Sequence, residues 1–348
     1  NRTTMTDSTK SGSSDTTTSG PQPERTTDTD TPSSKQSQPE DETVEIIEDP
    51  GNASGGANTT SESILPQEVL APPPISPSYD DIEKGELLGS GGNADVYRAT
   101  AISDSGEVPL AIKEPRMGGA TVDTDAIEKL LAEAETWQQL DDHDHIVSVI
   151  DFGSTPLPWI GMEYMDGGDL NERTGELPFE QTLWTALSIT RGIRYAHKRG
   201  VAHLDLKPSN ILFRSVESGW DVPKIADWGL SKHLLKQSQS VEGMSPRYAA
   251  PEQLDSEQFG QTDTVTDVYQ LGTVLYELFT GEPPFDGETY EVMNKIQSST
   301  PVPPSERADL PDVIDDVLLT ALATERGDRY DDVLYIRDAL QDVWEEYK

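Results

Sequence analysis

The order of secondary-structure signals constrains the fold of this chain more than any other feature of its sequence. Alternating and β-branched runs such as DVYRAT, PLAIKE and PWIGMEYM, between residues 95 and 165, predict short strands. Among them, TDAIEKLLAEAETWQQL (124–140) repeats apolar residues at three and four positions and predicts an amphipathic helix. After residue 178 the signals are mainly helical, as in FEQTLWTALSITRGIRYAHKRG and VTDVYQLGTVLYELFTG. A small β-rich part with one helix therefore precedes a larger helical part, and MDGGDL (165–170) is the expected hinge.

Residues 1–76 differ from the rest of the chain in composition. They are rich in Thr, Ser, Asp, Gly and Pro, as in TKSGSSDTTTSG, and they lack aromatic residues. Such a segment buries too little apolar area to offset the entropy lost on ordering. The sequence therefore predicts a disordered, acidic, Thr/Ser/Pro-rich tail over residues 1–76 and a folded domain over residues 77–348.

The charge of the chain disfavours one class of partner. The 64 acidic residues outnumber the 26 basic residues and give a net charge of −38, so the Lys and Arg clusters that neutralise nucleic-acid phosphates are absent. The acidic excess continues beyond the tail and is typical of salt-loving microbes, in which molar salt, with a Debye length of about 3 Å, suppresses self-repulsion. We expect a cytoplasmic protein of a high-salt cytosol, from a halophilic archaeon, that does not bind nucleic acid.

Other simple features exclude further classes. The chain has no cysteine, which removes disulfides, thiol catalysis and Cys-zinc sites. His143 and His145 in DDHDHIV make only a weak metal candidate, because the stretch is typical of a turn between a helix and a strand. No apolar run approaches the ~18 residues that span a bilayer, and residues 1–30 are polar, so neither a membrane segment nor a signal peptide is expected. The chain begins with Asn1 rather than Met, which leaves an upstream anchor open.

A glycine-rich turn and a buried lysine are the first signs of chemistry. LLGSGGNADVY (87–97) is typical of strand, turn and strand, and its glycines let the backbone approach a ligand and direct amide groups at phosphates. An ordinary hairpin turn is an equal alternative for this stretch alone. In LAIKE, Lys113 lies inside an apolar strand, where an unpaired ammonium is costly to bury. Glu133 in the following helix is the candidate partner, against the alternative of a solvent-facing Glu.

Two polar loops between apolar segments, VAHLDLKPSNILF and KIADWGLSK, predict a reaction centre. Asn210 and Asp227 offer the hard oxygen ligands that suit Mg²⁺. Asp205, with Lys207 two residues away, suits proton acceptance from an alcohol beside an electrostatic clamp on a phosphoryl group. A solvated turn between two strands is the alternative when either segment is considered alone.

Taken in order, these motifs resemble the eukaryotic-type (Hanks-type) serine/threonine protein kinase family over about residues 79 to 345. The resemblance implies an α+β, bilobal protein kinase fold with a small β-rich N-lobe containing one helix (79–162), a hinge (163–168) and a larger, mainly helical C-lobe (169–346). It implies transfer of the γ-phosphoryl group of Mg-ATP to Ser or Thr hydroxyls of proteins, the chain itself among them. DLKPSN resembles the Ser/Thr branch of the family.

The resemblance also implies roles for individual residues. Lys113 would hold the α and β phosphates and pair with Glu133, with Glu135 as the less favoured partner. Asp205 would be the catalytic base, and Lys207 would contact the γ phosphate. Asn210 and Asp227 would hold Mg²⁺, with Mn²⁺ as an alternative metal. The residues that would contact ATP are Gly89, Ser90, Gly91, Gly92, Val96, Ala111, Lys113, Met162 (the gatekeeper), Glu163, Met165, Asp169 and Leu212.

Further matches concern the C-lobe. MSPRYAAPEQ (244–253) resembles the substrate-docking segment of the family. There Glu252 would pair with Arg329 of GDRY, and Asp267 of TDVYQLG would anchor the catalytic loop.

Departures from the family pattern qualify these expectations. Leu204 stands where an Arg usually precedes the catalytic Asp, so no guanidinium is available there to bind a phosphorylated activation loop. Activity is therefore expected not to depend on such phosphorylation. Trp228 replaces the Phe of Asp-Phe-Gly, and Ala94 replaces the third glycine of the phosphate loop. Met244 and Ser245 alter the docking segment, which leaves substrate preference open.

Two alternative functions remain. A catalytically inactive kinase fold that serves as a binding module would usually lack one of the four residues Lys113, Asp205, Asn210 and Asp227, and all four are present. A small-molecule phosphotransferase of the related fold would lack an activation segment that ends in Ala-Pro-Glu, and this chain has AAPEQ. Both are disfavoured against a protein serine/threonine kinase.

Overall fold

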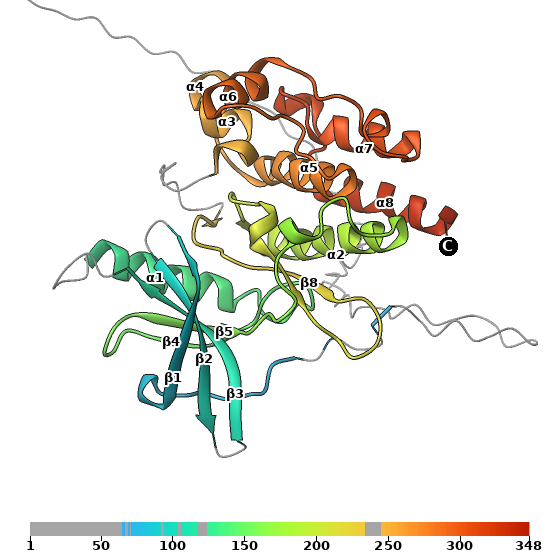
Figure 1. The fold of residues 1–348 in the computed structure, drawn as a ribbon. Helices are drawn as coiled ribbons and strands as arrows, with labels where there is room; N and C mark the ends of the chain where they lie inside the picture. Colours follow the sequence, from blue (N-terminus) through green and yellow to red (C-terminus); the bar gives the residue numbers. More distant parts are fainter. Residues whose placement is uncertain are drawn as a thin grey trace, which may run out of the picture. The chain divides into compact units, whose positions relative to one another are not determined.

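The computed structural model describes residues 65–66, 69, 71–91, 94–103, 106–116, 124–233 and 245–347. The first part of the fold is a five-stranded antiparallel sheet in the order β1-β2-β3-β5-β4. Its strands are β1 (Ile82–Ser90), β2 (Ala94–Ser103), β3 (Gly106–Pro115), β4 (Val149–Gly153) and β5 (Trp159–Glu163). Between β3 and β4 the chain forms α1 (Thr124–Gln138), which lies along the sheet (Figure 1).

Side chains along β3 alternate between two hydrophobic cores, one on each face of the sheet. Successive side chains of a strand point to opposite faces of the sheet. Leu110 and Ile112 are fully buried in a small core on one face, which also contains Trp159. Ala111, between them, belongs to the larger core on the other face. Lys113 follows Ala111 by two positions and therefore points to the same side as Ala111.

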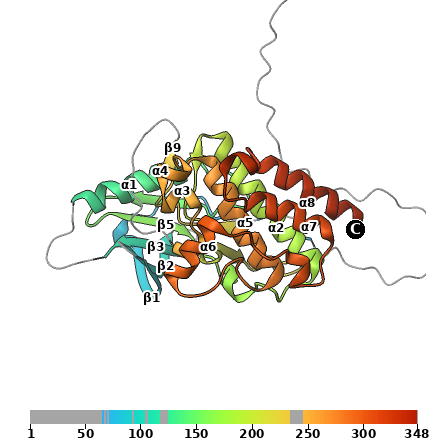
Figure 2. The ribbon, with the colours of Figure 1, turned by 90° about the horizontal axis from the view of Figure 1, so that it is seen from above.

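The second part of the fold is mainly helical. Its long helices are α2 (Phe179–Lys198), α5 (Thr264–Thr280), α6 (Thr289–Ser298), α7 (Asp312–Ala321) and α8 (Val333–Tyr347). Two short helices, α3 (Pro251–Leu254) and α4 (Ser256–Phe259), precede α5. α2 packs against both α5 and α8, and α7 packs against α5 and α8 (Figures 1 and 2). Single 3₁₀ turns lie at Tyr79–Asp81, Leu170–Glu172, Pro208–Asn210, Pro246–Tyr248, Pro304–Glu306 and Arg326–Asp328.

α5 is the central helix of this part. Asp263 caps its start by accepting a hydrogen bond from the N–H of Val265, and Gly281, in the left-handed conformation with a φ of 80°, ends it. Almost every residue between them is buried, the polar Asp267 and Gln270 included. Polar side chains on such a helix must find partners inside the protein. Asp267 binds the N–H of Leu204 before Asp205, and Gln270 binds the N–H of Leu206 after it.

Two small antiparallel ribbons connect the helices to the sheet. β6 (Val201–Ala202) pairs with β9 (Lys232–His233), and β7 (Ile211–Arg214) pairs with β8 (Val222–Ile225). The loop between α1 and β4 joins β8 through the N–H of Val147, which donates to the carbonyl of Ile225 over 2.9 Å. The two parts of the fold are thus linked by backbone hydrogen bonds as well as by the hinge.

The arrangement confirms the predicted α+β, bilobal fold: a β-rich first lobe with one helix is followed by a helical second lobe. The weak metal candidate at His143 and His145 has another explanation. His145 is buried, and its Nδ1 lies 3.0 Å from the carbonyl of Pro223. Within the described ranges, no three His, Asp or Glu side chains gather as a metal-binding group. In the same part of the chain, every helix is too short or too polar to cross a membrane.

The segment ahead of β1 packs on the domain. Ile75 and Tyr79 contact the small core of the sheet, and the Tyr79 hydroxyl donates a 2.6 Å hydrogen bond to Glu114 on β3. Further upstream, Leu65 and Val69 lie against the larger core. The sequence places the start of the folded domain at residue 77, and the described residues before it already contact that domain.

Candidate active site

Lys113 lies at the centre of a group of charges formed with Glu133 and Asp227. Its Nζ is 2.6 Å from Glu133 Oε1 and 2.7 Å from Asp227 Oδ1. The side chains of Lys113 and Glu133 are both almost buried. Burial alone would lower the pKa of Lys113, but the attraction of Asp227 and Glu133 outweighs this effect and raises it. Lys113 is therefore a fixed positive charge.

Sequence periodicity explains how Glu133 reaches this lysine. Glu133 shares the inner face of α1 with Leu130, Ala134 and Trp137, which are buried in the core. The helix is held in place by Trp137, whose Nε1 donates to the carbonyl of Val147 over 2.6 Å. Packing of α1 thus decides whether the ion pair with Lys113 forms.

Asp227 reaches Lys113 from the loop after β8. Its φ of 63° is in the left-handed region, which Asp tolerates better than most residues. Gly229, two residues further on, leaves room for Glu133, since a Cβ at Gly229 would lie 3.1 Å from Glu133 Oε2. The positive charge of Lys113 lowers the pKa of Asp227 to about 2, so this carboxylate is ionised at neutral pH.

The loop that follows β6 carries Asp205. Lys207 Nζ lies 2.5 Å from Asp205 Oδ2, and the Nδ2 of Asn210 donates to the Asp205 carbonyl over 2.8 Å. Burial raises the pKa of Asp205, and the charge of Lys207 opposes this shift. A buried carboxylate with a raised pKa and a neighbouring cation is suited to accept a proton next to an anionic group.

Hydrogen bonds join the Asp205 loop to the Asp227 loop. The N–H of Ala226 donates to the carbonyl of Asn210 over 2.8 Å. His203 Nε2 is 3.1 Å from the carbonyl of Ala226, and the rings of His203 and Trp228 lie 4.6 Å apart. Asp205, Lys207, Asn210 and Asp227, which are separated along the sequence, therefore belong to one connected group.

The glycine-rich turn lies between β1 and β2. Gly89 pairs with Val96 in the sheet, and the N–H of Gly91 donates to the Ala94 carbonyl over 2.9 Å. Gly92 lies outside the described residues. Arg116, at the end of β3, contacts Ser90 and donates to the Gly91 carbonyl over 2.6 Å. This arginine was not predicted from the sequence.

The strands next to Lys113 present the other expected nucleotide contacts. Val96 on β2 is opposite Lys113, and Ala111 on β3 is opposite Met162 on β5. Ala111 and Met162 are both buried. Val96, Ala111 and Met162 therefore lie on adjoining strands beside Lys113.

The hinge backbone is held by β7. The N–H of Gly167 donates to the carbonyl of Phe213 over 2.8 Å, and Asp169 forms a bridge with Leu212. Glu163, at the end of β5, and the half-buried Met165 precede these contacts. The Glu163 side chain turns inward to Lys224, with 2.7 Å between Oε2 and Nζ, so a contact of Glu163 with ATP would have to come from its backbone and stays a prediction.

Comparison with known proteins decides what this arrangement represents. A family model described as the protein kinase domain matches residues 82–344. The chain belongs to the protein kinase family. It is 33% identical over 287 residues to the serine/threonine-protein kinase PknB of Mycobacterium leprae, which covers 78% of this chain and 44% of that protein. It is also 34% identical over 281 residues to PknB of Mycolicibacterium smegmatis, with 76% and 43% covered.

A further relative is the serine/threonine-protein kinase Pkn1 of Myxococcus xanthus, 30% identical over 263 residues, with 73% of this chain and 37% of that protein covered. The chain thus spans less than half the length of the curated relatives it matches. The predicted family and the serine/threonine type of the kinase domain are confirmed by these similarities.

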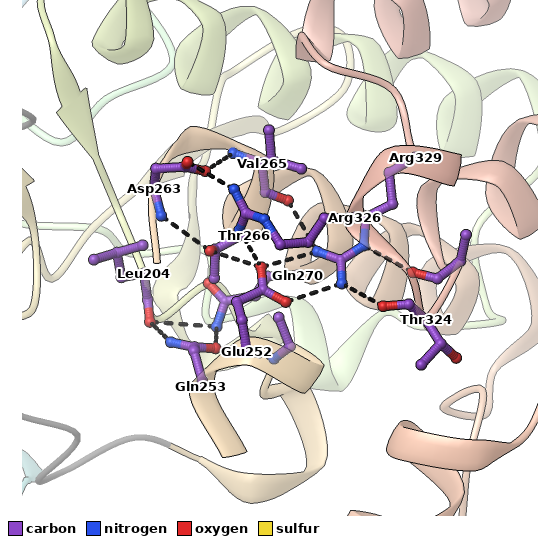
Figure 3. A network of polar contacts seen from close by, with 12 residues as sticks. Leu204, Glu252, Gln253, Asp263, Val265, Thr266, Gln270, Thr324, Arg326 and Arg329 are labelled. Carbon is purple, nitrogen blue, oxygen red and sulfur yellow. Dashed lines mark hydrogen bonds and ion pairs between the residues drawn. The ribbon is translucent and has the colours of Figure 1, made fainter. Parts of the chain in front are cut away.

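The end of the activation segment is anchored to the C-lobe of the kinase fold by Glu252 (Figure 3). Arg329 Nη1 and Nη2 each lie 2.9 Å from a Glu252 oxygen, as expected from the sequence. Arg326 adds a 2.9 Å contact to Glu252 and a 2.6 Å contact to Asp263, and the Thr266 hydroxyl donates to Glu252 over 2.8 Å. Arg326 and Thr266 were not foreseen.

The Leu204 and Trp228 departures are both buried in the C-lobe. Leu204 has a φ of 65°, and its N–H donates to Asp267 Oδ1 over 2.8 Å. Trp228 is fully buried, and its Nε1 has no hydrogen-bond partner among the residues that the structure describes. Met244 lies outside the described residues, whereas Ser245 is described.

Besides Arg326 and Thr266, sequence reasoning missed four residues near the site: Arg116, Lys224, Gln253 and Gln270. Only Lys224 carried a usable signal. It lies among apolar residues in VPKIA, where an unpaired ammonium is costly to bury, so the strand pattern predicts an acidic partner.

Proposed function

We propose that this kinase domain transfers the γ-phosphoryl group of Mg-ATP to Ser or Thr hydroxyls of proteins. One observation carries the proposal. Lys113 is held between Glu133 and Asp227 at 2.6 and 2.7 Å. The loop of Asp227 is joined to the loop of Asp205 by the hydrogen bond from the Ala226 N–H to the Asn210 carbonyl. A fixed cation, an ionised carboxylate and a desolvated carboxylate in one group suit phosphoryl transfer, which depends on positioning and charge stabilisation.

The residues divide the work as follows. Lys113 binds the α and β phosphates, and Glu133 fixes its ammonium. Asp205 accepts the proton of the attacking hydroxyl, and its raised pKa makes it a stronger base than a free carboxylate. Lys207, 2.5 Å from Asp205, offers its positive charge to the transferred phosphoryl group.

The metal-binding role rests on the donor set. Asn210 and Asp227 supply amide and carboxylate oxygens, which are hard donors, and Lys113 keeps Asp227 ionised. These residues therefore fit Mg²⁺, and Mn²⁺ as an alternative. When bound, the metal neutralises negative charge on the phosphates. The adenine is received by the backbone of the hinge, with Ala111, Val96 and Leu212 as apolar neighbours.

Two further statements belong to the proposal. The acidic composition, −38 overall, supports a high-salt cytosol of a halophilic archaeon as the setting, although the relatives named above are bacterial. In that setting the free energy of unfolding increases with KCl, and an unfolding midpoint indifferent to KCl would contradict it. The same charge disfavours nucleic acid as a partner and leaves proteins, in signalling by phosphorylation, as the substrates.

The experiment that tests the function is phosphate transfer from γ-labelled ATP with Mg²⁺ in molar KCl, to the protein itself and to a generic acceptor. Wild type should place label on Ser or Thr, and Asp205→Asn should abolish transfer while ATP binding remains. Asp338→Asn, on an exposed part of α8, is the matched control and should transfer like wild type. If wild type binds ATP but transfers no label, the inactive binding module replaces the proposal.

A further inference from the structure

The backbone on both sides of Asp205 is held by two side-chain amides. Gln253 Nε2 donates to the carbonyl of Leu204 over 2.9 Å, and Gln270 Nε2 donates to the same oxygen over 3.3 Å (Figure 3). Gln270 Oε1 in turn accepts the N–H of Leu206 over 3.2 Å. Gln270 thus spans Asp205 from the residue before it to the residue after it.

The orientation of the amides is determined by their partners. Gln253 Oε1 accepts hydrogen bonds from the N–H of Ala250 over 2.9 Å and from Gln270 Nε2 over 3.0 Å. Exchanging the oxygen and nitrogen of Gln270 would set donor against donor at Leu206 and acceptor against acceptor at Leu204. Both side chains are buried, Gln270 with 1% of its surface exposed, so an unmatched group would not be compensated by water.

The two glutamines connect the end of the activation segment to the catalytic loop around Asp205. Gln253 directly follows Glu252, which Arg329, Arg326 and Thr266 fix at the end of the activation segment. Gln270 projects from α5, one turn after Asp267, which binds the N–H groups of His203 and Leu204. The carbonyl of Leu204 is where the activation segment, the central helix and the catalytic loop meet.

We propose that Gln253 and Gln270 are positioning residues for Asp205, which tie the end of the activation segment to the catalytic loop without a phosphate. This inference rests on the proposed kinase activity. Leu204 provides no cation through which a phosphorylated activation loop would organise the catalytic loop. The amides supply the connection through neutral hydrogen bonds, which are buried and therefore not screened by salt.

The test uses Gln253→Met, Gln270→Met and the double variant, because Met keeps the length of the side chain and removes its hydrogen bonds. We expect kcat to fall about tenfold or more in each single variant, since small displacements of a catalytic group have large effects. The KM for ATP should stay within about twofold, because the phosphate-binding residues are untouched. In the double variant the two losses should not multiply, because the residues act as one unit.

Thr273→Val is the matched control. Thr273 is buried on the same helix, and its hydroxyl donates to the Tyr269 carbonyl over 3.1 Å without touching the catalytic loop. It should lower the unfolding midpoint as the Met variants do and leave kcat unchanged. Phosphatase treatment of wild type should also leave kcat unchanged.

The outcomes separate the inference from the function on which it rests. If wild type transfers phosphate and the Met variants, corrected for folded fraction, have the same kcat, the glutamines only fill the core and the inference fails while the function stands. Loss of kcat in Thr273→Val equal to that in the Met variants would also overturn it. If wild type transfers no phosphate, the function and the inference fail together.

Discussion

Lys224 and Glu163 form a fully buried ion pair, with 2.7 Å between Nζ and Oε2, that joins the two lobes of the kinase domain. Glu163 ends β5 at the hinge, and Lys224 lies on β8, three residues before Asp227. The pair therefore connects the adenine end of the proposed nucleotide site to its metal end. The backbone of Glu163 is held separately, because its N–H donates to the Ser148 carbonyl over 2.9 Å.

Removing one member of this pair should be more damaging than removing both. Lys224→Met leaves an uncompensated carboxylate inside the protein and should lower the free energy of unfolding by about 3–5 kcal/mol. The double variant Lys224→Met/Glu163→Met should recover most of this loss, since an apolar pair of similar volume replaces the charges. Denaturant unfolding of the three proteins in the same salt measures the difference. Equal losses in the single and double variants would show that the charges do not interact.

The Asp227 carboxylate should contribute to acid sensitivity in a defined pH range. Its pKa in the folded protein is about 2, below its ordinary 3.8, because of Lys113. A lowered carboxyl pKa stabilises the folded state above about pH 4, and this stabilisation is lost as the pH falls from about 4 through 2. The difference in unfolding free energy between wild type and Asp227→Asn should therefore shrink across that range. If the difference in unfolding free energy stays constant from about pH 5 to about pH 2, the assigned interaction between Asp227 and Lys113 is contradicted.

Arg329 and Arg326 bind the same carboxylate but should differ in importance. The side chains of Arg329 and Glu252 are fully buried, so Arg329→Met should cost about 3–5 kcal/mol of stability. Arg326 is partly exposed, and Arg326→Met should cost about 1 kcal/mol or less. Thermal unfolding in molar salt should show this ranking, and raising the salt should affect only the Arg326 contribution. The reverse ranking would mean that Arg326 carries the anchor of the activation segment.

Gly192 in α2 should resist the substitution that usually stabilises a helix. A Cβ at this position would lie 2.7 Å from Ile225 Cδ1 and 3.0 Å from the His145 carbonyl. Gly192→Ala should therefore destabilise the protein by about 1–3 kcal/mol, as overpacking does, although Ala is the better helix former. Gly327→Ala is the control, because a Cβ there meets no atom within 4 Å. Unfolding midpoints that rise in both variants would show that α2 is not held as close to β8 as described.

Features with a local signal could be predicted from the sequence. The apolar residues around Lys113 in β3 predict that this lysine lies inside the fold. The spacing of Leu130, Ala134 and Trp137 predicts that Glu133 is on the inner face of α1, as the ion pair with Lys113 requires. The polar loops around Asp205 and Asp227 interrupt apolar strands, and an interruption of that kind is visible without any structure. The segregation of strands before helices likewise gave the α+β fold.

The remaining contacts depend on distances that a sequence does not contain. Gln253 and Gln270 look like ordinary helix residues, and their importance arises only because α3 and α5 both reach the carbonyl of Leu204. Arg116 follows β3, and its contact with Ser90 at the end of β1 depends on the register of the strands in the sheet. Lys224 pairs with Glu163, which lies 61 residues earlier in the chain. Such pairs are fixed by the packing of whole elements rather than by local patterns.

The packing of the segment ahead of β1 bears on where the domain can be cut. Similarity to the family begins at residue 82, but Tyr79 hydrogen-bonds to Glu114, and Ile75 covers the small core of the sheet. A protein trimmed to residue 82 would uncover that apolar face and leave Glu114, next to Lys113, with only Lys84 as a partner among the contacts described. Exposed apolar faces on sheets favour self-association. A recombinant fragment intended for crystals or assays should therefore begin upstream of residue 65, not at the boundary that sequence similarity suggests.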